Sequence, residues 1–313
     1  MGERAMRDIR GDLEERAEKQ QKTKLNLVPI RPGGCKPPLF WVHGDCTDDF
    51  LKAYLDPDQP LYALKHQSRH GEVALYTRVE TIAACYLAQL LTVQAEGPYF
   101  LGGYSFGGTV AFEMARQLHT KHKSVALLFM IDPVCPGTRL EYPWSKQSST
   151  PRRAVESYYH HDLLHHLNNI LRLKPQQMLN YVQLRVKGKL KQKALKQKAF
   201  LQKILINIYV TIGRPIPYFL RKRYILKIYF DAIVQYAPKP YAGRAVYIKS
   251  EQRSGEHVTQ WSRLILGRLD QHEVADCDHK NIKKNPYACC WVKTLKACLM
   301  WAQEKKQDGS HWI

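Results

Sequence analysis

The sequence lacks both an apolar run long enough to cross a bilayer and a secretory leader. A membrane-spanning helix needs about 20 consecutive apolar residues, and none of that length is present. A signal peptide needs an apolar central stretch, whereas residues 1–24 are charged throughout. We therefore expect a cytoplasmic protein that has no transmembrane segment.

Acidic residues are scarce relative to basic ones. The 313 residues include 28 Asp and Glu against 48 Lys and Arg, which gives a formal net charge of +20 at pH 7. Such a balance predicts attraction to something acidic, namely nucleic acid, a membrane surface, a phosphorylated cofactor or an acidic protein. The hydrophobic fraction of 44% is ordinary for a globular chain, so a core of normal size can form.

The eight cysteines include no C-x-x-C pair and no spacing typical of zinc ligands. We expect them to be reduced thiols, most of them buried, as in a cytosolic protein. The segment 160–166 contains four histidines, and its i,i+4 pairs could bind zinc. Because no third zinc ligand is specified, we expect no metal site. We also expect no cofactor.

One stretch, residues 102–109, organises the chain. Residues 98–101 form an apolar run that predicts a short buried strand, and residues 109–118 have the apolar spacing of a helix. Between them lies Ser105, with Gly103 and Gly107 two residues to either side. This is the nucleophile elbow of an α/β-hydrolase, a turn so tight that a side chain at either glycine would clash with backbone. The helix N-terminus beneath the serine favours developing negative charge.

The remaining pattern predicts one α/β domain, not two domains in series. Residues 1–24 form a charged N-terminal extension, and residues 25–313 form the domain. We expect a mostly parallel twisted sheet with flanking helices, interrupted by a helical lid insertion at 139–235. The strands are expected at 25–30 (an edge strand), 39–43, 61–64, 98–101, 125–131, 244–248 and 272–275, and the helices at 78–96, 109–118, 261–265 and 287–303.

A serine nucleophile needs a histidine base, and the base needs an acid to orient it. Asp132 ends the strand that follows the elbow helix, so one right-handed crossover places it near Ser105. Glu251, after the 244–248 strand, is the second candidate for the acid. His279 lies in the loop between the last strand and the last helix, where the third member of such a triad belongs. His272, inside a strand pattern, is predicted to be structural.

An oxyanion hole needs two backbone N–H groups, one from the residue after the serine and one from the loop after the first core strand. These are the N–H of Phe106 and, in the segment 43–45, the N–H of Asp45. Because a carboxylate would oppose an oxyanion, the side chain of Asp45 must point away.

Four segments resemble the thioesterase domains of nonribosomal peptide and polyketide synthases, including their free-standing relatives. They read PPLFWVHG at 37–44, GPYFLGGYSFGGTVAFEMARQL at 97–118, ALLFMIDPVCPG at 126–137 and CDHKNIKKNPY at 277–287. The resemblance covers about 25–138 and 236–303, and the family's variable lid falls at 139–235. It favours Asp132 over Glu251 as the acid. Relatives often carry a glycine pair where this chain has Asp45, which makes the second oxyanion donor less secure than the triad.

The resemblance implies a two-step reaction. Ser105 attacks an acyl or peptidyl thioester on the phosphopantetheine of a carrier protein, and the acyl-enzyme is then released by water. An acyltransferase or cyclase that uses an alcohol or amine acceptor is the alternative, and a non-catalytic basic binding protein is a more distant one. The chain begins with methionine and no carrier segment precedes it, which resembles a free-standing thioesterase. An excised terminal domain is the alternative.

The segment 185–203 is rich in lysine, with an apolar stripe at helical spacing. A solvated lid helix and a docking site for an acidic carrier protein or for cofactor phosphates are equally compatible with it. Contact with a membrane surface is possible but less favoured, and no nucleic-acid partner is expected. Aromatic residues of the insertion are predicted to line an acyl pocket or the lid core: Tyr158, Tyr159, Tyr181, Tyr209, Tyr218, Phe219 and Tyr229.

Overall fold

A computed structural model describes residues 26–43, 48–135, 194–195, 197–253 and 255–307. The chain divides into two compact units. One unit consists of Met1–Thr138 and Pro217–Ile313, and the other of Arg139–Ile216. The predicted N-terminal extension and the histidine-rich segment 160–166 lie outside the described residues.

The first unit contains a seven-stranded sheet with the order β1-β3-β2-β4-β5-β6-β7. Neighbouring strands are parallel except for β1, which pairs antiparallel with β3 at one edge. The strands are β1 (Leu27–Arg31), β2 (Leu39–Val42), β3 (Leu61–Leu64), β4 (Tyr99–Tyr104), β5 (Val125–Ile131), β6 (Ala245–Ser250) and β7 (Leu269–Val274). The sheet confirms the predicted strands and the α/β-hydrolase fold.

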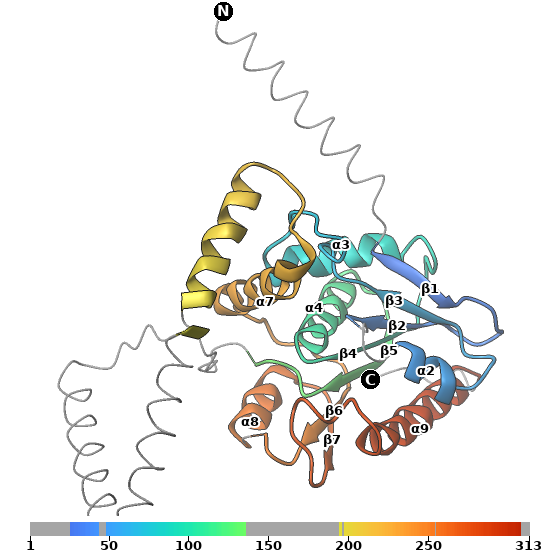
Figure 1. The fold of residues 1–313 in the computed structure, drawn as a ribbon. Helices are drawn as coiled ribbons and strands as arrows, with labels where there is room; N and C mark the ends of the chain where they lie inside the picture. The colour runs from blue at the N-terminus through green and yellow to red at the C-terminus, as the bar shows by residue number, and fades with distance from the viewer. Residues whose placement is uncertain (1–25, 44–47, 136–193, 196, 254, 308–313) are drawn as a thin grey trace, which may run out of the picture. The chain divides into compact units, whose positions relative to one another are not determined.

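Helices cover both faces of this sheet (Figure 1). The described helices of the unit are α2 (Asp48–Tyr54), α3 (Val79–Leu90), α4 (Phe106–Thr120), α7 (Tyr218–Gln235), α8 (Gly255–Leu264) and α9 (Tyr287–Gln307). On one face α2 and α9 pack against the sheet, and Trp41 of β2 stacks on Trp291 of α9 with ring centroids 6.0 Å apart. On the other face α3 packs beside α4, and Trp261 of α8 meets Phe112 of α4 edge-on. Strands buried on both faces explain the continuous apolar run at 125–131.

The parallel arrangement gathers the carboxyl ends of the central strands at one edge of the sheet. β4 is followed at once by α4, which crosses over to β5, the neighbouring strand. Ser105 separates β4 from α4 and Asp132 follows β5, so both residues emerge at this edge. The strand predicted at 98–101 continues to Tyr104, and the helix predicted from residue 109 already begins at Phe106. Ser105 is therefore the single residue between β4 and α4, and it forms the turn that joins them.

One expectation about the cysteines is wrong. Of the described cysteines, only Cys135 and Cys277 are buried, while Cys35 and Cys290 are exposed on the surface. None of the cysteines in the described ranges forms a disulfide. In the part of the chain that the structure describes, every helix is too short or too polar to cross a bilayer.

In the second unit the described residues form a helix at 197–211. Lys198 and Lys203 are exposed on it, as are apolar side chains such as Phe200 and Leu201. The rest of the predicted basic segment, residues 185–193 and Lys196, lies outside the described residues. The following helix α7 belongs to the unit that contains the sheet.

Candidate active site

Ser105 occupies a strained turn that only its neighbours make possible. Its backbone has φ +56° and ψ −123°, outside the usual regions for a residue with a side chain. A Cβ atom on Gly103 would lie 2.5 Å from the carbonyl group of Gly107, and one on Gly107 would lie 2.3 Å from the carbonyl oxygen of Val42. The predicted clash with backbone at both glycines is thus confirmed. Strain held by its surroundings in this way is typical of functional sites.

Asp132 lies at the end of β5, fully buried, with φ +42°. Its backbone N–H donates to the carbonyl oxygen of Ile248 at 2.8 Å, which holds the residue against β6. The backbone N–H of Ser250 donates to Oδ1 at 2.9 Å, and its hydroxyl donates to Oδ2 at 2.5 Å. Burial by itself would raise the pKa of Asp132, but the hydrogen bonds from His279 and Ser250 outweigh burial and lower that pKa. The carboxylate is therefore ionised at neutral pH.

His279 lies between Ser105 and Asp132. Its Nε2 is 3.0 Å from Oγ of Ser105, and its Nδ1 is 3.1 Å from Oδ2 of Asp132. Tyr104 supports the imidazole in two ways. Its hydroxyl donates to the backbone carbonyl of His279, and its ring stacks on the imidazole with centroids 4.9 Å apart. With Nδ1–H donating to Asp132, the lone pair of Nε2 faces the serine hydroxyl, as a general base requires.

The structure thus brings together the three residues that the sequence predicts as a triad, and it leaves the alternatives elsewhere. Glu251, the second candidate for the acid, is exposed and accepts the backbone N–H of Asp276 at 2.5 Å. His272 is exposed on β7, the edge strand. Among the described residues, neither forms a hydrogen bond or ion pair with Ser105 or His279.

Of the two predicted oxyanion donors, the structure describes only Phe106. It is the first residue of α4, where backbone N–H groups have no partner within the helix. Asp45 lies outside the described residues. The second donor therefore stays a prediction.

Aromatic rings enclose the elbow on the side of Phe106. Its ring stacks on Tyr229 of α7 at 4.1 Å and on His43 at 5.6 Å, and Tyr229 also stacks on His43 at 5.1 Å. Nε2 of His43 lies 2.6 Å from the hydroxyl of Tyr86. Burial, followed by the charges of His66 and Lys65, lowers the pKa of His43 well below the usual value, so this imidazole is neutral at pH 7.

Of the predicted pocket aromatics in the described part, Tyr229 alone is placed in this cluster. Tyr218 and Phe219 are 85% and 66% exposed, so the prediction that they line a pocket or a core is wrong. Both lie in the first turn of α7, just before Leu220, the first residue of that helix that packs inward.

Sequence reasoning missed three polar residues around the triad, namely Ser250, Arg253 and His257. Ser250 ends β6, and Arg253 and His257 follow in the next loop and in α8. One guanidinium N–H of Arg253 donates to the carbonyl oxygen of Pro133 at 3.0 Å. The sequence could have indicated the residues at the end of β6, because the carboxyl end of any strand beside β5 reaches the same edge of the sheet as Asp132.

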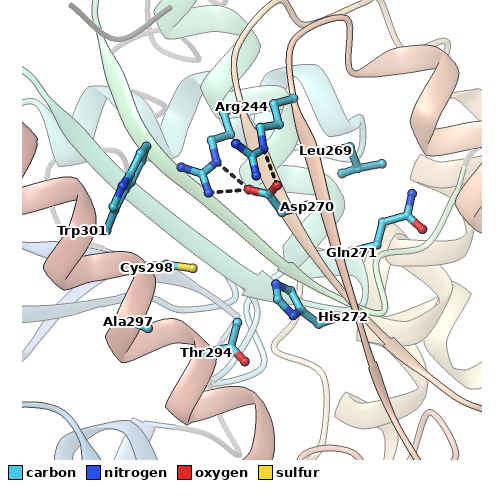
Figure 2. Close-up of a pocket in the computed structure, with 10 residues that line it drawn as sticks. Arg244, Leu269, Asp270, Gln271, His272, Thr294, Ala297, Cys298 and Trp301 are labelled. Atoms are coloured by element: carbon cyan, nitrogen blue, oxygen red, sulfur yellow. Dashed lines mark hydrogen bonds and ion pairs between the residues drawn. The ribbon is translucent and has the colours of Figure 1, made fainter. Parts of the chain in front are cut away.

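One hollow in the described part lies away from the triad. A cavity of about 530 Å³ opens between the start of β7 and α9 (Figure 2). There Asp270 pairs with Arg244 and Arg268, and the guanidinium of Arg244 lies 4.1 Å from the ring centre of Trp301. This cavity lies at the amino ends of β6 and β7, whereas the triad lies at the carboxyl ends of the strands. It contains no nucleophile and base in contact, so the chemistry is expected at the triad.

Comparison with known proteins identifies the family of this chain. A family model described as Thioesterase domain matches residues 49–205, which is half of the chain and includes Ser105 and Asp132. Malpinin synthetase from Mortierella alpina is 40% identical over 110 residues, which are 34% of this chain and 1% of that protein. The dimodular nonribosomal peptide synthase of Bacillus subtilis (strain 168) is 39% identical over 110 residues, again 34% of this chain and 5% of that protein. The chain therefore matches only a small part of the length of these relatives.

A solved structure shares the fold. The NocB thioesterase domain, in covalent complex with a fluorophosphonate nocardicin G analog, aligns with a TM-score of 0.55 and 18% identity. The alignment covers 87% of this chain and 99% of that domain. The chain has the α/β-hydrolase fold and belongs to the thioesterase domain family, whose members are hydrolases that act on thioesters.

Proposed function

We propose that this protein is a serine thioesterase that hydrolyses acyl or peptidyl thioesters from a phosphopantetheinyl carrier protein, through an acyl-Ser105 intermediate. The observation that carries the proposal is the continuous chain of contacts from Ser105 Oγ through His279 to Asp132, at 3.0 and 3.1 Å. Membership in the family supports the thioester, and the names of the relatives support a role in nonribosomal peptide or polyketide synthesis.

In the first step Nε2 of His279 takes the hydroxyl proton of Ser105 while Oγ attacks the thioester carbonyl carbon. The oxyanion that forms is stabilised by the N–H of Phe106 and by a donor from the loop after β2. When the intermediate collapses, the C–S bond breaks and the leaving thiolate takes the proton from His279. The ionised Asp132 stabilises the imidazolium in between.

In the second step His279 takes a proton from water, and the resulting hydroxide attacks the acyl-serine ester. Collapse of the second tetrahedral intermediate breaks the bond to Oγ, and the proton on His279 returns to Ser105. The products are a carboxylic acid, the carrier thiol and the original enzyme. An amine or alcohol in place of water would make the protein an acyltransferase or a cyclase.

The carrier protein is proposed to be attracted by the basic part of residues 185–203. Lys198 and Lys203 are exposed there, and the whole chain carries a net charge of +20. Complementary charge raises association rates more than it raises final affinity. This proposed surface is therefore expected to act on kcat/KM.

Intact-mass measurement with a panel of acyl-carrier thioesters tests the proposal. We expect a mass increase equal to the acyl group on the wild-type protein and none on Ser105→Ala. Released carboxylic acid indicates hydrolysis, whereas a product joined to an added amine or alcohol indicates transfer. If a fluorophosphonate fails to label Ser105 in the folded protein, the protein is a non-catalytic binding protein and the proposal is wrong.

A further inference from the structure

One aromatic side chain stands on each flank of Ser105. Tyr104, the residue before the serine, stacks on His279 with ring centroids 4.9 Å apart. Phe106, the residue after it, stacks on Tyr229 of α7 with centroids 4.1 Å apart and an angle of 15° between the ring planes. The nucleophile is therefore flanked by two stacked pairs, and one of them includes the catalytic base.

The order of the strands separates the two pairs in space. β4, which leads to Ser105, lies between β2 and β5 in the sheet. His43, which stacks on both rings of the Phe106 pair, directly follows β2. Asp132, which contacts His279, directly follows β5. The rings around Phe106 therefore stand on the β2 side of the serine, and the imidazole of the triad stands on the β5 side.

The chemistry of the proposed reaction decides which side receives the acyl group. In the tetrahedral intermediate the central carbon carries Oγ of Ser105, the oxyanion, the sulfur of the leaving group and the acyl chain. The sulfur must lie near Nε2 of His279, because that nitrogen donates the proton to the leaving group. The oxyanion lies toward the N–H of Phe106. The acyl chain therefore points away from His279, toward the β2 side, where the rings of Phe106 and Tyr229 stand.

The stacked rings leave no passage for a chain between them. Carbon atoms in contact are about 3.5–4.0 Å apart, so a methylene chain between two rings needs centroids about 7–8 Å apart. The centroids of Phe106 and Tyr229 are 4.1 Å apart, and Phe106 is buried. A chain long enough to reach the rings would therefore have to displace Tyr229 from Phe106.

Hydrogen bonds hold α7 on both sides of Tyr229. Before it in the chain, the hydroxyl of Tyr224 accepts the backbone N–H of Ala74 at 2.9 Å. After it, the hydroxyl of Tyr236 donates to the buried carboxylate of Glu113 at 2.8 Å. Glu113 belongs to α4, the helix that begins at the elbow. Because Tyr229 lies between these two attachments, its ring is held against the elbow, and displacing it costs free energy.

We propose that the stacked pair of Phe106 and Tyr229 limits the length of the acyl group, so that the enzyme prefers short acyl chains to medium and long ones. This limit rests on the proposed serine thioesterase function and narrows its substrate class. Tyr229 is the specificity-determining side chain, since the backbone of Phe106 also serves the oxyanion. In a pocket of fixed size, one methylene too many lowers kcat/KM by about 10–200-fold.

The test measures kcat/KM for the acetyl, butanoyl, hexanoyl and octanoyl thioesters of N-acetylcysteamine, which need no carrier protein. In the wild type we expect kcat/KM to fall by about tenfold or more from acetyl to octanoyl. In Tyr229→Ala the octanoyl-to-acetyl ratio is expected to rise by about tenfold or more, because the ring no longer blocks the longer chain. In Tyr229→Phe, which keeps the ring, the ratio should stay at the wild-type value. The matched control is Tyr218→Ala, which removes the same side chain from a site on the same helix where it is 85% exposed.

A wild-type kcat/KM that does not fall from acetyl to octanoyl overturns the proposal. So does a ratio that is unchanged in Tyr229→Ala, or that rises equally in Tyr218→Ala. If Tyr229→Ala fails to fold, Tyr229→Leu gives the same reading, because leucine retains apolar volume but cannot stack on Phe106. Failure of the proposed function looks different, because the wild-type protein would then hydrolyse none of the four thioesters in a manner that depends on Ser105.

Discussion

Ser250 holds both carboxylate oxygens of Asp132, with its N–H 2.9 Å from Oδ1 and its hydroxyl 2.5 Å from Oδ2. Ser250→Ala removes the second bond. Because these bonds help lower the pKa of Asp132 in the folded protein, they contribute stability above the unfolded pKa, and this contribution is lost as pH falls through the folded pKa. We expect Ser250→Ala to lose about 1.5–3 kcal/mol at pH 7, measured by urea unfolding.

The difference between wild type and Ser250→Ala is expected to shrink as the pH falls below about 4, first as the carboxyl protonates in the unfolded state and then as it protonates in the folded state. Asp132→Asn in the same background supplies the control, since it removes the charge and should remove most of the effect of the second substitution. A stability difference that stays constant down to pH 2 would contradict a role through the carboxylate charge.

Asp132, and not Glu251, is expected to be the acid of the triad. Asp132→Asn should lower kcat by about 10⁴ because it disturbs the tautomer of His279 while leaving the fold in place. Glu251→Gln should change kcat less than about threefold, because in the described part of the chain the side chain of Glu251 accepts a hydrogen bond from the backbone of Asp276 and none from the triad. Steady-state rates with one soluble thioester decide between them, and the reverse order of effects would show that Glu251 is the acid.

The elbow should tolerate no side chain at Gly107. A methyl group there meets the carbonyl oxygen of Val42, so Gly107→Ala is expected to cost about 1–3 kcal/mol of stability. Its labelling by a fluorophosphonate should also slow, because the serine is displaced. Gly33→Ala is the matched control, since no atom lies within 4 Å of its added carbon. Equal stability of the two variants in urea unfolding would contradict the close approach of α4 to β2.

The lysines of the helix at 197–211 test the proposed docking of the carrier protein. Lys198→Glu with Lys203→Glu should lower kcat/KM on a carrier-bound acyl group by about tenfold at low salt. The rate on a small soluble thioester should be spared. The control pair is Lys121→Glu with Lys239→Glu, two exposed lysines of the sheet unit. The effect should fade in high salt, where surface charges are screened. An equal loss on both substrates would contradict docking at this helix.

Local patterns determine much of this protein. Strands and helices leave periodic traces, so the sheet strands from 25–30 to 272–275 and the helices α3, α4 and α9 were predictable, whereas α2 was not predicted. The sharp turn at Ser105 needs a glycine two residues away on each side, and the five residues 103–107 show this pattern directly. Asp132 follows β5 and His279 follows β7. That both lie at one edge of the sheet follows from the rule that the carboxyl ends of parallel strands share an edge.

Tertiary structure alone decided which polar groups meet there. Ser105 and His279 are 174 positions apart, and Asp132 and Ser250 are 118 apart. Contacts across such separations leave no periodic pattern in a single sequence. The backbone turn that aims a side chain, such as φ +42° at Asp132, is equally invisible. The sequence by itself therefore determined the sheet, the elbow and the candidates for the triad. Only the packing of β5 against β6 and of the last loop against the elbow decided that Asp132 faces His279, and that Arg253 lies beside them.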